Sequence, residues 1–384
     1  MTSKTQMYDL MIVGAGPAGC SAALALANSG LKVALLDKTT FPRDKVCGDA
    51  IPGPVFKYLK QLNPVWSEEL LQDGLDLRVQ ESRIYAPSGK WLDLKWVLPT
   101  GNARRLDFDN AILDLVKKYT STEIIEDFAV KQIIPSQNGI SAQGKKDVLN
   151  ARHAILASGG QAPFMRKLRA DVIDRTHHCA AVRAYIQHIE GLDPGKNEFF
   201  LLKNYLPGYF WMFPLENGWA NVGFGMRSDE VSRRKVDLKK VLLDILHNEP
   251  LLRNRFASSD LSMKIHGFGL PLASREITIS GPSWMAIGDA AGLIDPMQGH
   301  GIDNAVWSGI EAAKHLEKMY SGELTEVQAH QQYRQEVYKK INQPMKRAHR
   351  LVQVLNSTPH ILNGLVWAGG IPLVQRMIQK SPFW

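Results

Sequence analysis

Three glycines near the start of the chain have the spacing of a phosphate-binding turn. Gly14, Gly16 and Gly19, with Pro17 and Ala18 between them, follow directly on an apolar segment. In a strand–turn–helix unit the first glycine permits a tight turn, and the second lets the backbone approach a pyrophosphate. The third glycine lets the helix pack closely on the strand. The free N–H groups of the helix N-terminus then suit a diphosphate.

The surrounding pattern predicts the elements that this turn requires. Residues 8–13 are typical of a buried strand, a helix of small residues follows and ends near Gly30, and residues 32–36 form a second strand. Asp37 comes next, where a carboxylate can accept hydrogen bonds from an adenosine ribose. A lone glycine motif is weak evidence, but the complete unit is strong. The sequence therefore predicts a dinucleotide site, and this motif alone does not decide between FAD and NAD.

A polar, turn-rich segment over residues 41–53 contains further candidates. Arg43 and Lys45 could neutralise phosphate, and Gly48 lets the backbone approach a flat ring because it has no side chain. Cys47 is a candidate reactive group, although an inert buried thiol is the commoner state of a cysteine. Arg105 precedes a predicted amphipathic helix, residues 107–119, where a cofactor could pass.

The middle of the chain is predicted to be rich in strands. A hairpin is expected over residues 82–97, and strands are expected over 123–126, 129–134 and 152–158. The last of these ends at Ser158 and Gly159. Four strands between residues 179 and 225 read as an antiparallel sheet with dense aromatic residues. Those aromatic residues are either an ordinary sheet core or the lining of a substrate cavity.

A second motif lies about 270 residues after the first. A strand over 284–287 runs into Gly288-Asp289-Ala290-Ala291-Gly292, and a helix is predicted over 303–318. An acid directly after a strand can bind the hydroxyl groups of a sugar-alcohol chain. Gly299 and Gly301, at a helix N-terminus, offer backbone N–H groups to a ring carbonyl.

The motifs together resemble one family. PRDKVCGD, RLDFD, PGYFWMFP, NVGFG and GDAAGLIDPMQGHGIDNAVWSG are similar to segments of the geranylgeranyl reductase family, within the FAD-containing aromatic hydroxylase-like superfamily. The resemblance implies an α/β fold, with a Rossmann-like FAD-binding domain, an interleaved antiparallel β-sheet substrate domain and a C-terminal helical segment. The expected FAD-binding domain covers residues 1–75, 100–175 and 275–325, the substrate domain 76–99 and 176–274, and the helical region 326–384.

The resemblance also implies roles for individual residues. Asp37 would bind the adenosine ribose, Ala129 the adenine and Asp289 the ribityl or pyrophosphate part, while Arg105 and Cys47-Gly48 would lie along the flavin. The other residues expected at the cofactor are Lys38, Arg43, Ser158, Gly159 and Ile302. Tyr209, Trp211 and Phe213 would line a prenyl cavity. The chain departs from the family at Ser158, where Asp is frequent, and in the loop with Asp295 and His300, where family members more often have Asn-Pro and Gly-Glu-Gly.

The implied activity is reduction of isoprenoid C=C bonds by hydride transfer from reduced FAD. Cys47 and His300 are the candidate proton carriers, NAD(P)H is a candidate donor that docks transiently, and no metal is expected. An FAD-dependent monooxygenase acting on an aromatic or polyene compound is the alternative, as a hydroxylase or halogenase, because one fold supports both chemistries. A protein that holds FAD only for electron transfer is a third interpretation.

Composition bounds the setting of this chemistry. The 384 residues are 45% apolar, carry a formal net charge of +8 and include three cysteines without metal-ligand spacing. This favours a large core in a reducing compartment, hence a cytoplasmic protein, and nucleic acid is not an expected partner. The apolar segment 359–384 follows a basic cluster. It could lie peripherally at a membrane or pack as a helix on the core, and the sequence favours neither.

Overall fold

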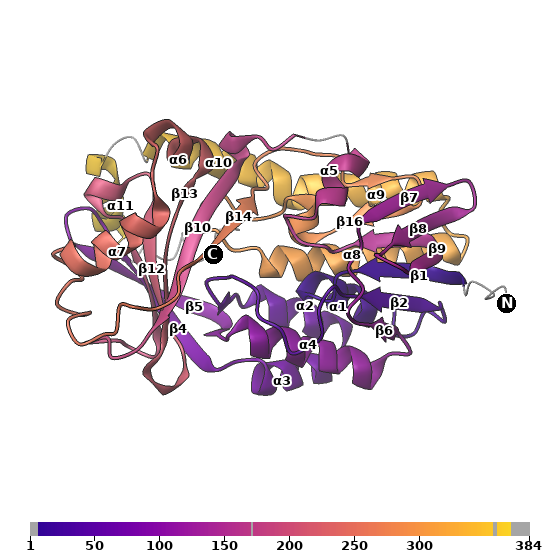
Figure 1. The fold of residues 1–384 in the computed structure, drawn as a ribbon, viewed down its shortest axis with the longest axis horizontal. Coiled ribbons are helices and arrows are strands. Elements are labelled where there is room, and N and C mark those ends of the chain that lie inside the picture. The colour runs from indigo at the N-terminus through magenta and orange to yellow at the C-terminus, as the bar shows by residue number, and fades with distance from the viewer. Residues whose placement is uncertain (1–6, 170–171, 356–358, 370–384) are drawn as a thin grey trace.

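The computed structural model describes residues 7–169, 172–355 and 359–369. In this part of the chain two large sheets lie at opposite ends of the molecule, with helices between them in the view of Figure 1. The first sheet has the order β15-β16-β9-β1-β2-β6, and the hairpin β7–β8 continues from β9. Its strands are β1 (Met7–Val13), β2 (Val33–Leu36), β6 (Glu123–Ile125), β7 (Gln132–Ser136), β8 (Gly139–Gln143), β9 (Val148–Leu156), β15 (Ser280–Gly281) and β16 (Trp284–Ala286).

The central strands of this sheet are parallel and largely buried. β1 pairs in parallel with both β2 and β9. On the outer sides, β2 pairs in parallel with β6, and β9 pairs in parallel with β16. Each of the four residues of β2 is buried, as expected where helices cover both faces of a parallel sheet. The carboxyl ends of β1, β2 and β9 therefore open on one edge, which is where α/β sheets bind ligands.

Helices pack around the first sheet and fill the space between it and the second sheet (Figure 1). They are α1 (Pro17–Ala25), α2 (Pro54–Leu62), α3 (Pro64–Asp73), α4 (Arg105–Tyr119), α5 (Pro163–Arg169), α8 (Ile302–Tyr320), α9 (Glu326–Val337), the π-helix η5 (Tyr338–Asn342) and α10 (Gln343–Leu355). α1 and α8 lie side by side (Figure 1). A Cβ at Gly309 of α8 would overlap the backbone oxygen of Ala18 in α1, so only glycine permits this approach.

The second sheet has the order β14-β10-β13-β12-β11-β4-β5-β3. Its strands are β3 (Ala50–Ile51), β4 (Leu77–Tyr85), β5 (Trp91–Asn102), β10 (His178–Ile186), β11 (Lys196–Phe200), β12 (Tyr209–Pro214), β13 (Ala220–Arg227) and β14 (His266–Pro271). The four strands expected between residues 179 and 225 are β10 to β13, and they pair antiparallel as predicted. In addition, β11 pairs in parallel with β4. The chain leaves this sheet after β5, builds part of the first sheet and returns at β10, and β11 then lies beside β4.

One face of the second sheet is covered by helices. Phe210, Met212, Val222 and Phe224 pack with Leu242, Ile245 and Leu246 in one apolar cluster. The covering helices are α6 (Ser228–Arg234) and α7 (Leu238–Asn248), and α11 (Pro359–Gly369) contacts β5. Because side chains alternate along a strand, Tyr209, Trp211 and Phe213 of β12 point to the opposite face. The remaining short helices are η1 (Arg175–His177), η2 (Lys203–Tyr205), η3 (Glu216–Gly218) and η4 (Gly288–Ala291).

Several predicted boundaries were wrong by a few residues. The helix expected to reach Gly30 ends at Ala25, and the strand expected from Ala129 begins at Gln132. Phe128 donates its N–H to the backbone oxygen of Asp37, whereas Lys131 donates to the backbone oxygen of Gln143 in β8. The chain therefore passes from the end of β2 to the hairpin between these two residues. The strand expected over 152–158 ends at Leu156, which leaves Ser158 and Gly159 in a loop.

Both sheets draw strands from segments far apart in sequence. β3 and the end of β5 belong to the second sheet, although residues 50–51 and 100–102 fall in the segments predicted for the FAD-binding domain. Asp49, directly before β3, accepts a backbone hydrogen bond from Ala103. The predicted domain boundaries stay a prediction. At residues 50–51 and 100–102 the strands belong to the second sheet, although the predicted boundaries place them in the FAD-binding domain.

Candidate active site

The glycine turn closes the end of β1 and leaves space in front of α1. Gly14 has a φ of +112°, and a Cβ there would overlap the backbone oxygen of Ala157 at the end of β9. A Cβ at Gly19 would overlap the oxygen of Gly14. At Gly16 the nearest atom to such a Cβ is Arg43 Nη2, at 3.6 Å. Packing therefore demands Gly14 and Gly19, whereas Gly16 borders open space at the start of a helix.

The N-terminus of α1 is free to bind a ligand. Pro17 occupies its first turn, and among the described residues no side chain caps the helix. Uncapped N–H groups at a helix N-terminus favour an anion.

Asp37 ties this turn to the neighbouring strand ends. Its Oδ2 accepts a hydrogen bond from the Ala15 backbone N–H at 2.9 Å, and Oδ1 accepts from the N–H and hydroxyl of Thr39 at 3.0 and 2.8 Å. A carboxylate has about four acceptor positions, so one remains for a further donor. The contact between Phe128 and Asp37 places Ala129 at the same edge, while Lys38 is exposed beside it.

A buried ion cluster stands beside the glycine turn. Asp109 of α4 binds Arg105 through two hydrogen bonds of 2.6 Å and Arg43 through a third of 2.6 Å. Arg105 is 2% exposed and Asp109 is fully buried. Burial alone would raise the pKa of Asp109, but the charge and hydrogen bonds of Arg105 hold it below its usual range. The cluster fixes Arg105, whose guanidinium also interacts with the Cys47 sulfur.

Asp109 is a residue whose role sequence reasoning missed. It stands four residues after Arg105, the spacing at which two side chains meet on one face of a helix. That signal was available in the segment RLDFD.

The second glycine motif meets the first in space. Lys45 Nζ lies 2.9 Å from the carboxylate of Asp289, although 244 positions separate them in the chain. A Cβ at Gly288 would come within 3.2 Å of Ala18 Cβ. The turn after β16 thus packs on the start of α1, and both predicted acidic turns lie at the same edge of the first sheet.

The loop before α8 is fixed by Asp295. The Asp295 carboxylate accepts hydrogen bonds from the N–H groups of Met297 and Gln298 at 2.6 and 3.0 Å. The backbone N–H of Asp295 donates to the oxygen of His300 at 2.8 Å. This closed loop presents Gly299 and Gly301 at the N-terminus of α8, which has no side-chain cap in the described part of the chain.

His300 carries a charge in this loop. Its Nδ1 lies 2.8 Å from Asp303 Oδ1 and its Nε2 lies 3.7 Å from Asp295 Oδ2, and 26% of its side chain is exposed. Burial favours the neutral ring, but both carboxylates oppose it and raise the pKa of His300 to about 9. The imidazole is therefore protonated at neutral pH.

The side chains of Tyr209, Trp211 and Phe213 form an aromatic wall that faces the loops at Gly48 and Gly299. The ring centroids of Tyr209 and Trp211 are 5.9 Å apart, and Phe213 stands 6.3 Å from Trp211. Phe213 would be 3.3 Å from a Cβ at Gly48, and Tyr209 donates its hydroxyl proton to the oxygen of Gln298 at 2.8 Å. The structure thus brings the expected prenyl-lining residues against the two loops expected around the flavin.

The end of β9 completes the cleft. Ser158 Oγ is buried and has no hydrogen-bond partner among the described residues. Gly159 has a φ of +76°, and no atom lies within 4 Å of where its Cβ would stand. Ile302 is 8% exposed in the first turn of α8.

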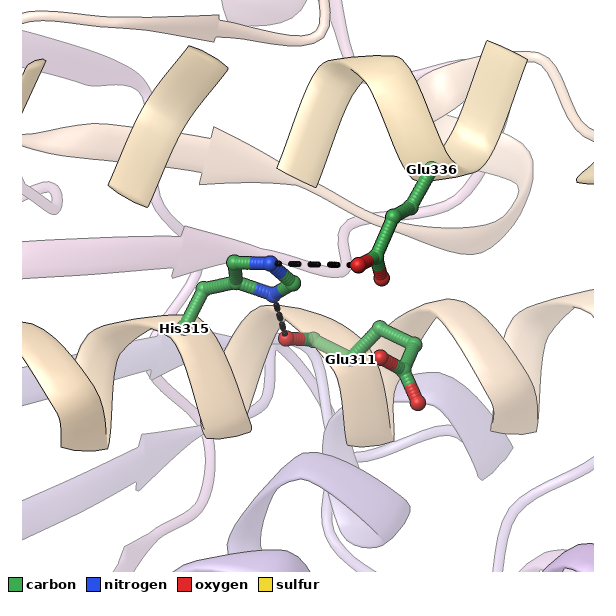
Figure 2. Close-up of side chains that lie close together, drawn as sticks. All are labelled: Glu311, His315 and Glu336. Carbon is green, nitrogen blue, oxygen red and sulfur yellow. Dashed lines mark hydrogen bonds and ion pairs between the residues drawn. The ribbon is translucent and has the colours of Figure 1, made fainter. Parts of the chain in front are cut away.

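Among the described residues, one group of side chains of the types that can bind a metal lies on α8 and α9. Figure 2 shows Glu311, His315 and Glu336 facing one another, with ligand atoms all within 4.8 Å. His315 Nδ1 lies 2.8 Å from the backbone oxygen of Glu311, and Nε2 lies 3.8 Å from Glu336. The group begins about 15 Å along α8 from Gly301, so it is remote from the cleft. Its contacts describe a buried histidine that joins two helices.

The charge on His300 predicts a pH-dependent contribution to stability. A histidine pKa of about 9 in the folded chain, against about 6.5 when unfolded, stabilises the fold below pH 6.5. That contribution is lost as the pH rises through 9. His300→Gln should therefore lower the free energy of unfolding by roughly 1–2 kcal/mol at pH 6, allowing for partial exposure, and by much less at pH 9.5. Urea unfolding at both pH values measures the difference.

Asp303→Asn is the companion variant, because it removes the nearer carboxylate and should lose most of the same pH-dependent increment. A loss in His300→Gln that is equal at both pH values would contradict the charged state.

Comparison with known protein families gives an independent view of this cleft. Residues 8–192 match the family described as pyridine nucleotide-disulphide oxidoreductase, and residues 177–259 match the geranylgeranyl reductase catalytic domain. The second match covers β10 to β13, including the aromatic wall.

The similarity to individual relatives covers most of the chain. A menaquinone reductase of Mycobacterium tuberculosis is 31% identical over 322 residues, which cover 80% of this chain and 76% of that protein. A digeranylgeranylglycerophospholipid reductase of Thermoplasma acidophilum is 28% identical, over 80% of this chain and 78% of its own length.

Solved structures share the fold. A geranylgeranyl bacteriochlorophyll reductase-like protein from Thermoplasma acidophilum superposes with a TM-score of 0.82 at 23% identity, covering 95% of this chain and 92% of that one. A flavin-dependent brominase reaches a TM-score of 0.78 at 19% identity, over 98% of this chain and 93% of that one. At such identities the likeness concerns the fold alone. The similarity to the mycobacterial reductase, with the catalytic-domain match, shows that the chain belongs to the geranylgeranyl reductase family of FAD-dependent oxidoreductases.

Proposed function

We propose that this protein reduces C=C bonds of a geranylgeranyl or related isoprenoid lipid. The single observation that carries the proposal is the aromatic face of β12, which stands against both Gly48 and the loop at Gly299. An apolar wall at this place suits a hydrocarbon chain beside a flavin ring. The names of the two relatives agree, because menaquinone and a digeranylgeranyl phospholipid both carry isoprenoid chains.

The residues of the cleft fit an FAD molecule. Within the described residues, the starts of α1 and α8 have no side-chain cap, the Ser158 hydroxyl has no partner, and space is open at Gly16 and Gly159. All four features offer contacts to a ligand. We assign the pyrophosphate to the glycine turn with Arg43, and the adenosine to Asp37, Lys38 and Ala129. The ribityl chain would lie at Asp289, and the ring at Cys47, Gly48, Arg105, Gly299, Gly301 and Ile302.

Reduced FAD supplies a hydride from its N5 atom. The other carbon of the double bond must then receive a proton, and the chain offers two candidate carriers. His300 is protonated at neutral pH and partly exposed at the start of α8. Cys47 lies in the loop against the aromatic wall and interacts with Arg105. We favour His300, because Asp295 and Asp303 keep it charged until a stronger base draws the proton away.

The electron donor is a separate proposal. The sequence contains one G-x-G-x-x-G motif, and the cleft described here accounts for it. NAD(P)H would therefore dock transiently at the cleft, or another reductant would serve. The likeness to a brominase keeps an FAD-dependent monooxygenase or halogenase as the second candidate function, since this fold supports both chemistries.

Anaerobic turnover tests the reductase proposal. FAD-loaded protein reduced with dithionite and mixed with a geranylgeranyl lipid should reoxidise its flavin without oxygen, and the lipid should gain two hydrogens per bond reduced. Trp211→Ala should lower kcat/KM by about 10–100-fold, roughly 1.4–2.7 kcal/mol, because the apolar wall is lost. Stopped-flow absorbance and mass spectrometry provide the readouts.

Met212→Leu is the matched control, since it changes a buried side chain on the opposite face of the same strand. Product that forms only when oxygen is admitted would favour the monooxygenase. Flavin that no prenyl compound reoxidises would favour a role in electron transfer alone.

We also propose that the protein contacts membranes peripherally through α11. Val366 packs against β4 and β5, whereas Leu365 and Trp367 are 48% and 69% exposed. Basic residues at Lys339, Lys340, Lys346, Arg347 and Arg350 stand on the preceding helices. No described helix is long and apolar enough to cross a membrane. Residues 370–384, part of the segment expected at the interface, lie outside the described residues.

Vesicle flotation tests this contact. Leu365→Glu combined with Trp367→Glu should reduce co-flotation with vesicles rich in anionic phosphatidylglycerol, because two charges would enter the apolar contact. Val327→Glu changes an exposed apolar residue of α9 and should leave flotation unchanged. If the Leu365→Glu, Trp367→Glu double variant floats to the same extent as the native chain, the proposed membrane contact is wrong.

A further inference from the structure

The residue after Gly48 occupies an unfavourable position for its type. Asp49 is fully buried and has a φ of +67°. A left-handed backbone is uncommon for a residue other than glycine, although Asp and Asn tolerate it best. Its Oδ1 is buried and has no hydrogen-bond partner in the described part of the chain. Such a costly arrangement persists only where the surrounding structure enforces it.

The other oxygen of this carboxyl anchors a network beneath the cleft. Asp49 Oδ2 accepts hydrogen bonds from the Tyr185 hydroxyl at 2.7 Å and from Asn221 Nδ2 at 2.8 Å. Asn221 Nδ2 also donates to the backbone oxygen of Cys47 at 2.8 Å, and Asn221 Oδ1 accepts from Trp211 Nε1 at 2.9 Å. One amide therefore joins the Cys47-Gly48 backbone to the aromatic wall.

The network fixes the separation of these two surfaces. A Cβ at Gly48 would stand 3.3 Å from Phe213 and 3.6 Å from Trp211 Nε1, so the loop already touches the rings. Because the Asn221 amide bonds both groups, a small rotation of this amide would shift the Cys47 carbonyl and the Trp211 indole at the same time. The distance between loop and rings thus depends on the group that orients Asn221.

We propose that Asp49 is a positioning residue that, through Asn221, holds the Cys47-Gly48 backbone against Trp211 at the face where flavin and substrate meet. The inference deepens the proposed function and rests on it only for the effect on turnover. The hydrogen bonds and the burial exist whichever substrate the cleft binds.

Burial and the neighbouring charges together set the pKa of the Asp49 carboxyl. Burial raises the pKa of Asp49 to about 6, although the hydrogen bonds from Tyr185 and Asn221 and the charges of Arg183 and Arg105 lower it. Arg183 is itself paired with Asp44 at 2.7 Å, and Arg104 lies over the Tyr185 ring. The carboxyl is thus ionised at neutral pH, and ionisation costs stability as the pH rises from about 4 to 6.

Three substitutions separate hydrogen bonding from backbone strain. Asp49→Asn keeps an acceptor for Tyr185 and Asn221 and tolerates a positive φ. Asp49→Gly removes the acceptor but relieves the backbone, and Asp49→Ala removes the acceptor and keeps the strain. The readout that needs no substrate is the rate at which iodoacetamide alkylates Cys47 in FAD-loaded protein, followed by mass spectrometry of the Cys47 peptide.

The proposal predicts the same change in both variants that lack the acceptor. Asp49→Gly and Asp49→Ala should each alter the alkylation rate by about tenfold or more, since the loop is released, and Asn221→Ala should reproduce the effect. Asp49→Asn should stay within about threefold of the native rate. A native rate in Asp49→Gly beside an altered rate in Asp49→Ala would overturn the proposal in favour of backbone strain alone.

Thermal unfolding gives a second readout. The melting temperature of Asp49→Asn relative to the native chain should be higher at pH 7.5 than at pH 4.5, because the variant carries no buried charge. An identical difference at both pH values would contradict the buried ionised carboxyl.

Turnover closes the test. With a prenyl substrate, Asp49→Gly should lower kcat with little change in KM, and Asp49→Asn should recover most of it. Absence of turnover in the native chain would count against the proposed function and leave the alkylation result standing. Full kcat in Asp49→Gly would show that the network does not position the cleft.

Discussion

The contact between α1 and α8 is the constraint on which the site depends. Only glycine lets the two helices approach so closely, since a Cβ at Gly309 would overlap the backbone oxygen of Ala18. In the turn after β16, a Cβ at Gly288 would come within 3.2 Å of the Ala18 Cβ. This packing brings the turn after β1 and the turn after β16 to one edge of the sheet. Backbone packing therefore brings together the two glycine turns that we propose to hold FAD.

Charges then hold the segments that cross this edge. Asp109 anchors Arg105 and Arg43, and Lys45 joins Asp289, so the loop over residues 43–48 is tied both to α4 and to the second glycine turn. Removing one member of such a buried cluster leaves an uncompensated charge, which typically costs several kcal/mol. The loop therefore has a defined conformation under the aromatic wall. The same ties hold Gly48 beside Phe213 and Trp211.

The sequence predicted the parts of the site whose signals are local. The turn over Gly14 to Gly19 and the strands around it form within 30 positions, and each element has its own pattern. The cross-chain contacts had no such signal. Asn221 meets Asp49 across 172 positions and Arg43 meets Asp109 across 66, so only the folded chain reveals these partners. The parallel pairing of β4 with β11 escaped prediction for the same reason.

In the proposed site, two turns far apart in the sequence hold one FAD molecule. Titration of the purified protein with FAD, followed by flavin fluorescence, tests this most directly in the native chain and in Asp37→Ala and Asp289→Ala. One FAD should bind per chain, and each substitution should weaken binding by about tenfold or more, roughly 1.4 kcal/mol or above. A chain that binds no FAD, or an Asp289→Ala variant with native affinity, would contradict the convergence of the two turns on a single cofactor.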